Sequence, residues 1–216
     1  MALCAKRSDG MEVKMENESV INKRITDFSK SADIAQTIII FLIALLVPTF
    51  LGQLITSLFG STSVIASNSQ LIVGTIVNMA LVTTAINLKG WTKILGVVTM
   101  PSISTILSGY VFGTASTYMV YMIPAIWVGN FALVYAYKFI MLGKNKHYFL
   151  AGVVGVVVKV AIIFAFFGIL NAFSVFPEKL VSNLQTAMST TQLITATLGV
   201  ILSFIIYKLE KKSAKE

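Results

Sequence analysis

The chain has 216 residues, of which 56% are hydrophobic and 12% are charged, with a net charge of +8 and a mean hydropathy of +0.84. A soluble domain carries about 25% charged residues, so this composition excludes an ordinary soluble domain and indicates an all-α integral membrane protein. The positive charge does not indicate nucleic-acid binding, because the lysines and arginines lie at the ends of apolar segments, as topology determinants do.

The first segment, residues 1–33, is polar and charged, and we expect it to be a cytoplasmic tail. Ile21, Ile25 and Phe28 occur at i, i+4 and i+7 among charged residues, which fits a short amphipathic helix on the membrane surface. A solvated tail without such a helix accounts for the same residues equally well.

Six apolar segments follow, each near the ~20 residues that a helix needs to cross a bilayer. We therefore predict one six-helix transmembrane domain over residues 34–207 and a basic cytoplasmic tail over residues 208–216. The predicted helices are Ile34–Leu58, Gln70–Leu88, Thr92–Phe112, Tyr118–Leu142, Tyr148–Phe173 and Leu184–Tyr207.

The basic residues predict the orientation. If six helices alternate, all Lys and Arg residues except Lys159 and Lys179 fall on one side of the membrane. This is the positive-inside pattern, so we expect both termini in the cytoplasm of a multi-pass protein of the cell membrane. The longest loop on the other side, Ser57–Gln70, is either a passive connection or a lid over an outward-facing pocket.

Acidic residues are absent from Ile34 to Pro177 and again from Lys179 to Leu209. The one histidine, His147, lies at the predicted cytoplasmic end of the fifth helix, so neither a nucleophile–base set nor a His/Cys/acid metal cluster can be assembled. We therefore predict that the protein is not an enzyme and holds no metal and no cofactor.

Three amide side chains lie at membrane depth: Asn78, Asn130 and Gln192. Asn78 shares a helical stripe with small residues, and Gln192 belongs to a polar-to-small face of the last predicted helix. Such amides either bond across helices as part of ordinary packing or contact a ligand. Both interpretations stay open for each residue.

Lys159 stands near the middle of the long apolar segment "AGVVGVVVKVAIIFAFFGIL". A lysine at the centre of a membrane helix costs roughly 2.5–3.5 kcal/mol on insertion scales, and no acid at depth can pair with it. An anionic ligand would satisfy the ammonium, and so would a structural set of carbonyl groups. Gly152 and Gly155 lie near the same face, which predicts that a neighbouring helix approaches there.

Four stretches resemble the substrate-binding (S) components of energy-coupling factor transporters. "VGTIVNMALV" (Val73–Val82) looks like the G-x-x-x-N segment of that superfamily's second helix, and "MIPAIWVGNFALVYAY" (Met122–Tyr137) looks like the P-x-x-x-x-G-N segment of its fourth. "VVKVAIIFAF" (Val157–Phe166) and "TTQLITATLGVILSFII" (Thr190–Ile206) look like its last two helices. The resemblance covers about residues 34–207.

The resemblance implies a subunit that binds a vitamin or related micronutrient from the outer side of the membrane. It implies as partners a transmembrane scaffold subunit and two ATPase subunits, which would use the ATP. The family's ligand contacts map onto Asn130, Lys159 and Gln192, with Asn78 placed less securely. The resemblance does not identify the substrate, but the charge of Lys159 favours one with an anionic or carbonyl-rich group.

One feature departs from the family. The first predicted helix has Ala35 and Ala44 but lacks the A-x-x-x-A motif with which many members dock on the scaffold. Two alternatives therefore stay open: a small secondary carrier or channel, and a structural membrane subunit of a larger complex. Missing carboxylates and missing inverted halves argue against the carrier. A structural subunit would have no pocket.

Overall fold

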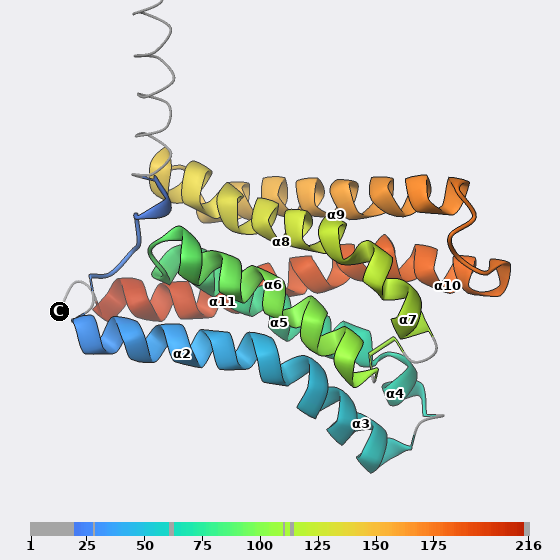
Figure 1. Cartoon of the computed structure of the whole chain (residues 1–216). Coiled ribbons are helices and arrows are strands. Elements are labelled where there is room, and N and C mark those ends of the chain that lie inside the picture. The colour runs from blue at the N-terminus through green and yellow to red at the C-terminus, as the bar shows by residue number, and fades with distance from the viewer. Residues whose placement is uncertain (1–19, 28, 61–62, 110, 113–114, 214–216) are drawn as a thin grey trace, which may run out of the picture.

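The computed structural model describes residues 20–27, 29–60, 63–109, 111–112 and 115–213. Every regular element in these residues is a helix, and the helices form one bundle (Figure 1). Five helical segments are long and apolar enough to cross a membrane: Lys30–Phe59, Ser69–Asn87, Ser116–Gly143, Tyr148–Ala172 and Glu178–Lys212.

The first segment is a bent helix. It consists of α2 (Lys30–Leu46), a π-helical turn (Val47–Leu51) and α3 (Gly52–Phe59), and α3 diverges from the direction of α2 in Figure 1. The helix begins four residues before the predicted Ile34, because the Ser29 hydroxyl accepts a hydrogen bond from the Ala32 amide (3.3 Å) and caps it. Pro48 lies in the wide turn and explains the bend, since it has no backbone donor.

Helix α5 (Ser69–Asn87) follows the short α4 (Val64–Ser67) and lies against the last helix, α11 (Thr190–Ser213). Glycines bring the two backbones together. A Cβ on Gly199 would lie 2.5 Å from the Asn78 Cβ, and a Cβ on Gly74 would lie 3.0 Å from the Thr195 Cγ2. The close approach of α5 and α11 therefore depends on the absence of side chains at these two positions.

Helix α6 (Trp91–Ser108) corresponds to the predicted third helix, Thr92–Phe112. It is not among the five apolar segments, because Lys93, Pro101 and several hydroxyl side chains lower its hydropathy. One of these hydroxyls, on Ser104, bonds the Thr49 hydroxyl at 2.7 Å and so joins α6 to the first segment. The structure thus has five candidate spans, and a sixth through α6 stays a prediction.

The remaining predicted helices form with shifted bounds. The fourth is composed of α7 (Ser116–Met119), a 3-10 turn (Val120–Met122), α8 (Ile123–Ala136) and a π-helical turn (Tyr137–Gly143). The fifth is α9 (Tyr148–Ala172). The sixth is divided at Ser189 into α10 (Glu178–Met188) and α11, which continues through residues 208–213, where a tail was predicted.

The residues just before α2 pack against the bundle. Ile21 is fully buried in the core, the Ile25 amide donates to the Ile86 carbonyl (3.0 Å), and residues 22–27 are not helical. Over residues 22–27 the chain therefore does not form the surface helix that the spacing of Ile21, Ile25 and Phe28 allows, and Ile21 packs against apolar neighbours inside the protein. Phe28 lies outside the described residues.

Candidate functional site: a polar cavity between the helices

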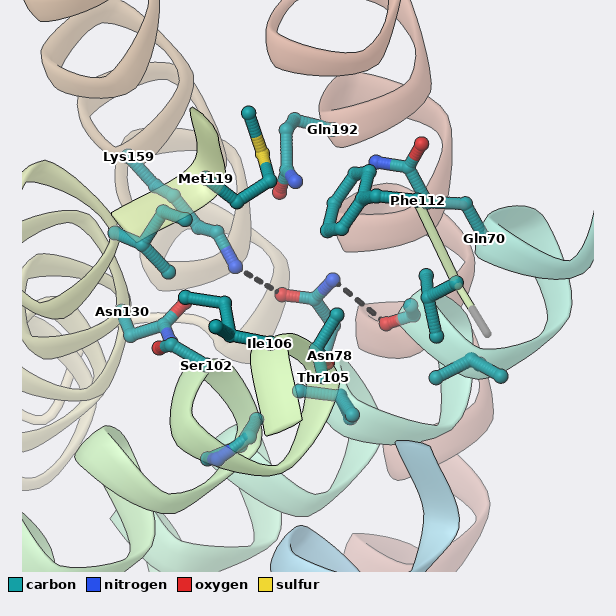
Figure 2. A pocket seen from close by; sticks show the side chains of 16 residues that line it. Gln70, Asn78, Ser102, Thr105, Ile106, Phe112, Met119, Asn130, Lys159 and Gln192 are labelled. Atoms are coloured by element: carbon teal, nitrogen blue, oxygen red, sulfur yellow. Dashed lines mark hydrogen bonds between the residues drawn. The ribbon is translucent and has the colours of Figure 1, made fainter. Parts of the chain in front are cut away.

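A cavity of about 70 Å³ lies among α5, α6, α8, α9 and α11, in the half of the bundle away from the described chain ends. Figure 2 shows its lining side chains. Apolar residues from these helices supply much of the wall. Its polar lining residues are Gln70, Asn78, Ser102, Thr105, Asn130, Lys159 and Gln192. The structure thus brings all four predicted site residues, Asn78, Asn130, Lys159 and Gln192, to one cavity.

Lys159 extends from α9 into this cavity with only 2% of its surface exposed. Its ammonium donates a hydrogen bond to the Asn78 Oδ1 at 2.5 Å (Figure 2). Among the described residues that line the cavity, Lys159 is the one charged residue, and none carries a carboxylate. The lysine is therefore held by a neutral amide rather than by an ion pair.

Glycines set the position of Lys159 along the bundle. A Cβ on Gly129 of α8 would lie 3.2 Å from the Lys159 carbonyl oxygen, and a Cβ on Gly155 of α9 would lie 2.8 Å from the Leu133 Cδ1. A Cβ on Gly152 would lie 2.8 Å from the Tyr137 hydroxyl. The small-residue face of α9 therefore packs closely on α8, which places the lysine at the wall of the cavity.

Asn78 links three helices. Its amide nitrogen donates to the Gly74 carbonyl (2.8 Å) and to the Thr195 hydroxyl (3.4 Å), and the Thr195 hydroxyl donates to the Gln192 carbonyl (3.3 Å). The amide oxygen is thereby turned toward Lys159. This chain of bonds fixes the orientation of the Asn78 side chain across α5, α9 and α11.

Two polar atoms in the cavity lining lack a hydrogen-bond partner among the described residues. Asn130 donates to the Val98 carbonyl (3.2 Å), but its Oδ1 is buried without a hydrogen bond, and so is the Ser102 hydroxyl. Buried polar atoms are nearly always hydrogen-bonded. The cavity is large enough for water, which can satisfy these atoms until another molecule replaces it.

Gln192, the fourth predicted residue, is half-buried in the first turn of α11. In Figure 2 it lies with Met119, Phe112 and Gln70 on one side of the cavity, and Asn130, Ser102 and Thr105 lie on the other. Of the loop predicted as a possible lid, only Gln70 lines the cavity, and residues 61–62 of it lie outside the described residues.

Several lining residues were missed by the sequence analysis: Gln70, Ser102, Thr105, Phe112 and Met119. A signal for two of them exists, because Ser102 directly follows Pro101 and Thr105 lies one turn later on the same face. Phe112 and Met119 carry no such signal, since aromatic and apolar residues are common throughout this chain.

The cavity is small for an organic ligand. Ligand sites in proteins typically enclose about 300–1,000 Å³, whereas this cavity measures about 70 Å³. In this conformation it holds only water-sized molecules, so a larger ligand requires side chains at the wall to move. Phe112 and Met119 line the cavity from the segment between α6 and α8, outside both of these helices. Their side chains are therefore suited to move when a larger ligand enters.

A second buried lysine provides a contrast. Lys138 is fully buried near the opposite end of the bundle, where its ammonium donates to the carbonyls of Leu88 (2.7 Å) and Lys23. Lys138 does not line the cavity around Lys159. Lys138 is thus a structural lysine bonded to backbone carbonyls, whereas Lys159 contacts a side chain beside open volume.

No family model, no curated protein and no solved structure matches this chain. The residues around the cavity are therefore the basis for the functional conclusion.

Proposed function

We propose that the protein is a membrane-embedded binding subunit that captures a small anionic or carbonyl-rich molecule in the cavity around Lys159. The observation that carries this proposal is a buried ammonium that lines a cavity and has an amide oxygen as its protein partner. An ammonium has three donors, and Asn78 accepts one of them. An anionic or carbonyl oxygen in the cavity would accept another.

The energetics favour a ligand at this point. A buried charge without a counter-charge is costly, and a charge-assisted hydrogen bond from an anionic ligand recovers about 1.5–3 kcal/mol. The open Asn130 Oδ1 and the Ser102 hydroxyl offer further bonds, the amide oxygen as an acceptor and the hydroxyl as a donor or an acceptor. Together with Lys159 they suit a molecule that has both a negative oxygen and a donor group.

The finer proposal is a substrate-binding component of an energy-coupling factor importer for a vitamin or related micronutrient. Asn78 and Asn130, which come from two of the four segments that resemble that superfamily, both line the cavity. The chain has no G-x-x-x-x-G-K-[S/T] sequence, so ATP hydrolysis would come from two partner subunits and docking from a membrane scaffold.

The same proposal includes six spans with both chain ends in the cytoplasm of the cell. The described chain starts and stops at the same end of the bundle (Figure 1). An odd number of crossings would put these ends on opposite sides of a bilayer. A sixth span through α6 would bring these ends to the same side, and the packing of α6 between α2 and α8 supports this proposal.

One observation favours a structural membrane subunit instead: Lys159 is bonded inside the protein, to Asn78. A structural role accounts for that bond but leaves the cavity and its open polar atoms unexplained. Nothing in the described site favours a secondary carrier or channel, because none of the described lining residues has a carboxylate.

Mass spectrometry of small molecules that co-purify with the protein in mild detergent tests the proposal directly. We expect one anionic or carbonyl-rich compound in near-stoichiometric amount, and purified protein should rebind it. Proteoliposomes with this protein alone should bind the compound without accumulating it. Accumulation driven by a proton or sodium gradient would instead favour a carrier, and the absence of any binding would favour a structural subunit.

A further inference from the structure

A groove of about 610 Å³, larger than the cavity around Lys159, lies at the end of the bundle where the described chain starts and stops. It is formed by the loop before α9, the first turn of α9 and the last turns of α11. Lys146, His147, Lys208 and Lys211 line it, and none of the described lining residues is acidic. The groove is separate from the cavity around Lys159 and is positively charged.

The cations of this groove are not neutralised within the described part of the chain. The ion pairs found there join Arg24, Lys89 and Lys93 to Asp27 and Asp33, and none includes a lysine of the groove. Glu210, the acid nearest in sequence, has its Oε1 bonded to the Asn87 amide nitrogen at 2.6 Å. The positive charge of the groove is therefore available to an anion from outside the described protein.

Aromatic rings form the wall beneath these lysines. Tyr148, Phe204 and Tyr207 lie with ring centroids 5.0–5.8 Å apart. The Lys208 ammonium lies 5.2 Å from the Phe204 ring centroid, and the Lys211 ammonium donates to the Tyr207 hydroxyl at 3.4 Å. Tyrosine and lysine gather in this way at the level of lipid headgroups, where one side is apolar and the other wet.

The start of α9 adds to the positive potential. His147 precedes the helix but makes no side-chain cap, so the first-turn amides keep the partial positive charge of a helix N-terminus. Asn145, with a φ of 51°, turns the chain tightly just before it and brings Lys146 to the groove. The lysines and the N-terminal end of α9 therefore both contribute positive potential to the groove.

Apolar surface adjoins the groove on the same helices. Ile205 and Leu209 of α11 are 58% and 64% exposed, and Phe149 of α9 is also exposed. A small soluble anion would not contact this apolar surface, whereas the acyl chains of a lipid would cover it. Charge and apolar surface side by side thus match an amphiphile with a negative head.

We infer that this groove binds the phosphate-bearing headgroup of an anionic membrane lipid. The lysines contact the phosphate, the aromatic rings lie beside the glycerol region, and the acyl chains run along the exposed face of α9 and α11. Basic pockets between membrane helices bind such headgroups on general electrostatic grounds. The inference does not rest on the proposed function, because no residue of the Lys159 cavity takes part.

The test is native mass spectrometry of the full chain in mild detergent, titrated with phosphatidylglycerol or with phosphatidylcholine of the same acyl chains. We expect phosphatidylglycerol to bind more tightly to the wild type. The Lys208→Gln/Lys211→Gln double variant should lose about 30-fold in phosphatidylglycerol affinity, about fivefold for each lysine. Both lysines are exposed, so the variant should keep the thermal stability of the wild type in phosphatidylcholine.

The matched control is Lys30→Gln/Lys179→Gln, which removes the same charge at two exposed positions outside the groove. An equal loss of affinity in this control would show that only net charge matters and would overturn the inference. Displacement of the lipid by millimolar inorganic phosphate would assign the groove to a soluble anion. Unchanged lipid binding in the double variant, with loss of a partner subunit instead, would make it a protein-docking surface. Either result would overturn lipid binding.

Discussion

Replacing Lys159 by methionine separates a binding role from a structural role. In the structure the Lys159 ammonium lies 2.5 Å from the Asn78 Oδ1, and none of the lining residues that the structure describes has a carboxylate. Methionine keeps much of the side-chain length and removes the charge. If the ammonium bonds an anionic or carbonyl oxygen of the ligand, the variant loses about 1.5–3 kcal/mol of binding energy, which is about 10- to 150-fold in affinity.

The same substitution should leave the ligand-free protein about as stable as the wild type. It deprives the Asn78 Oδ1 of its donor, which costs about 1–3 kcal/mol. It also removes a charge from the middle of a membrane helix, which gains about 2.5–3.5 kcal/mol on insertion scales. The two effects nearly cancel, so we expect an unchanged or slightly higher Tm.

Lys138→Met is the matched control, because Lys138 is the other fully buried lysine of the described residues. It donates to two backbone carbonyls that have fixed positions, those of Leu88 and Lys23. Lys138 lies in the last turns of the apolar segment Ser116–Gly143 rather than at its centre, so removing its charge recovers little insertion energy. Its loss should lower the free energy of unfolding by about 2–4 kcal/mol and leave ligand affinity unchanged. The assays are titration calorimetry with the co-purified ligand and thermal unfolding in mild detergent.

Two results would refute this reasoning. A Lys159→Met variant that binds the ligand as tightly as the wild type would show that the ammonium does not contact it. A variant that unfolds as readily as Lys138→Met would show that Lys159 is structural. Lys159→Arg should also bind more weakly, because a planar guanidinium does not replace a compact ammonium.

Three further predictions concern packing, access and topology. Gly199→Ala should lower the free energy of unfolding by about 1–3 kcal/mol by forcing α11 from α5, whereas Gly168→Ala, with no atom within 4 Å of its Cβ, should be neutral or stabilising by up to about 1 kcal/mol; thermal unfolding compares them. Phe112→Ala at the cavity wall should speed ligand dissociation about tenfold by removing part of a phenylalanine's burial energy, measured in a chase experiment; an unchanged rate would exclude Phe112 as a barrier. Reporter fusions should place Glu216 inside and Ser63 outside, and an external C-terminus would contradict six spans.

Much of the helical architecture could be predicted because it is local. Apolar length and hydropathy identify the five candidate spans, and capping by Ser29 explains the earlier start of the first. The breaks were not predictable in the same way. Ser189 has an irregular backbone (φ −115°, ψ −89°) between α10 and α11 without a proline or glycine to mark it, so tertiary packing decides that the helix is interrupted there.

The sequence allows individual site residues to be predicted on single helices, but it does not predict how they come together in one cavity. Asn78, Asn130 and Gln192 stood out because amides are rare at membrane depth. Ser102 did not stand out, because hydroxyls in such helices usually bond their own backbone, as Thr75 and Thr84 do here with the carbonyls four residues earlier. Only the three-dimensional arrangement shows that the Ser102 hydroxyl faces the cavity and lacks a partner.

Position in the sequence predicts the burial of one of the two buried lysines, Lys159, but not that of the other, Lys138. Lys138 lies near the cytoplasmic end of the predicted fourth helix, Tyr118–Leu142, and so was counted among the topology charges. The residues before α2 nevertheless fold over it, and their Lys23 carbonyl accepts a hydrogen bond from its ammonium. Its burial depends on a contact between residues more than a hundred positions apart, which no local pattern reports. Lys159 lies in the middle of an apolar segment, where any fold must bury it, so its burial was predictable from the sequence alone. What was not predictable is its partner. The backbone carbonyls around Lys138 have fixed positions, so a ligand cannot take their place. The Lys159 ammonium is bonded to the Asn78 amide beside a cavity, so it can bond a ligand as well. For this reason the binding role is proposed for Lys159 and not for Lys138.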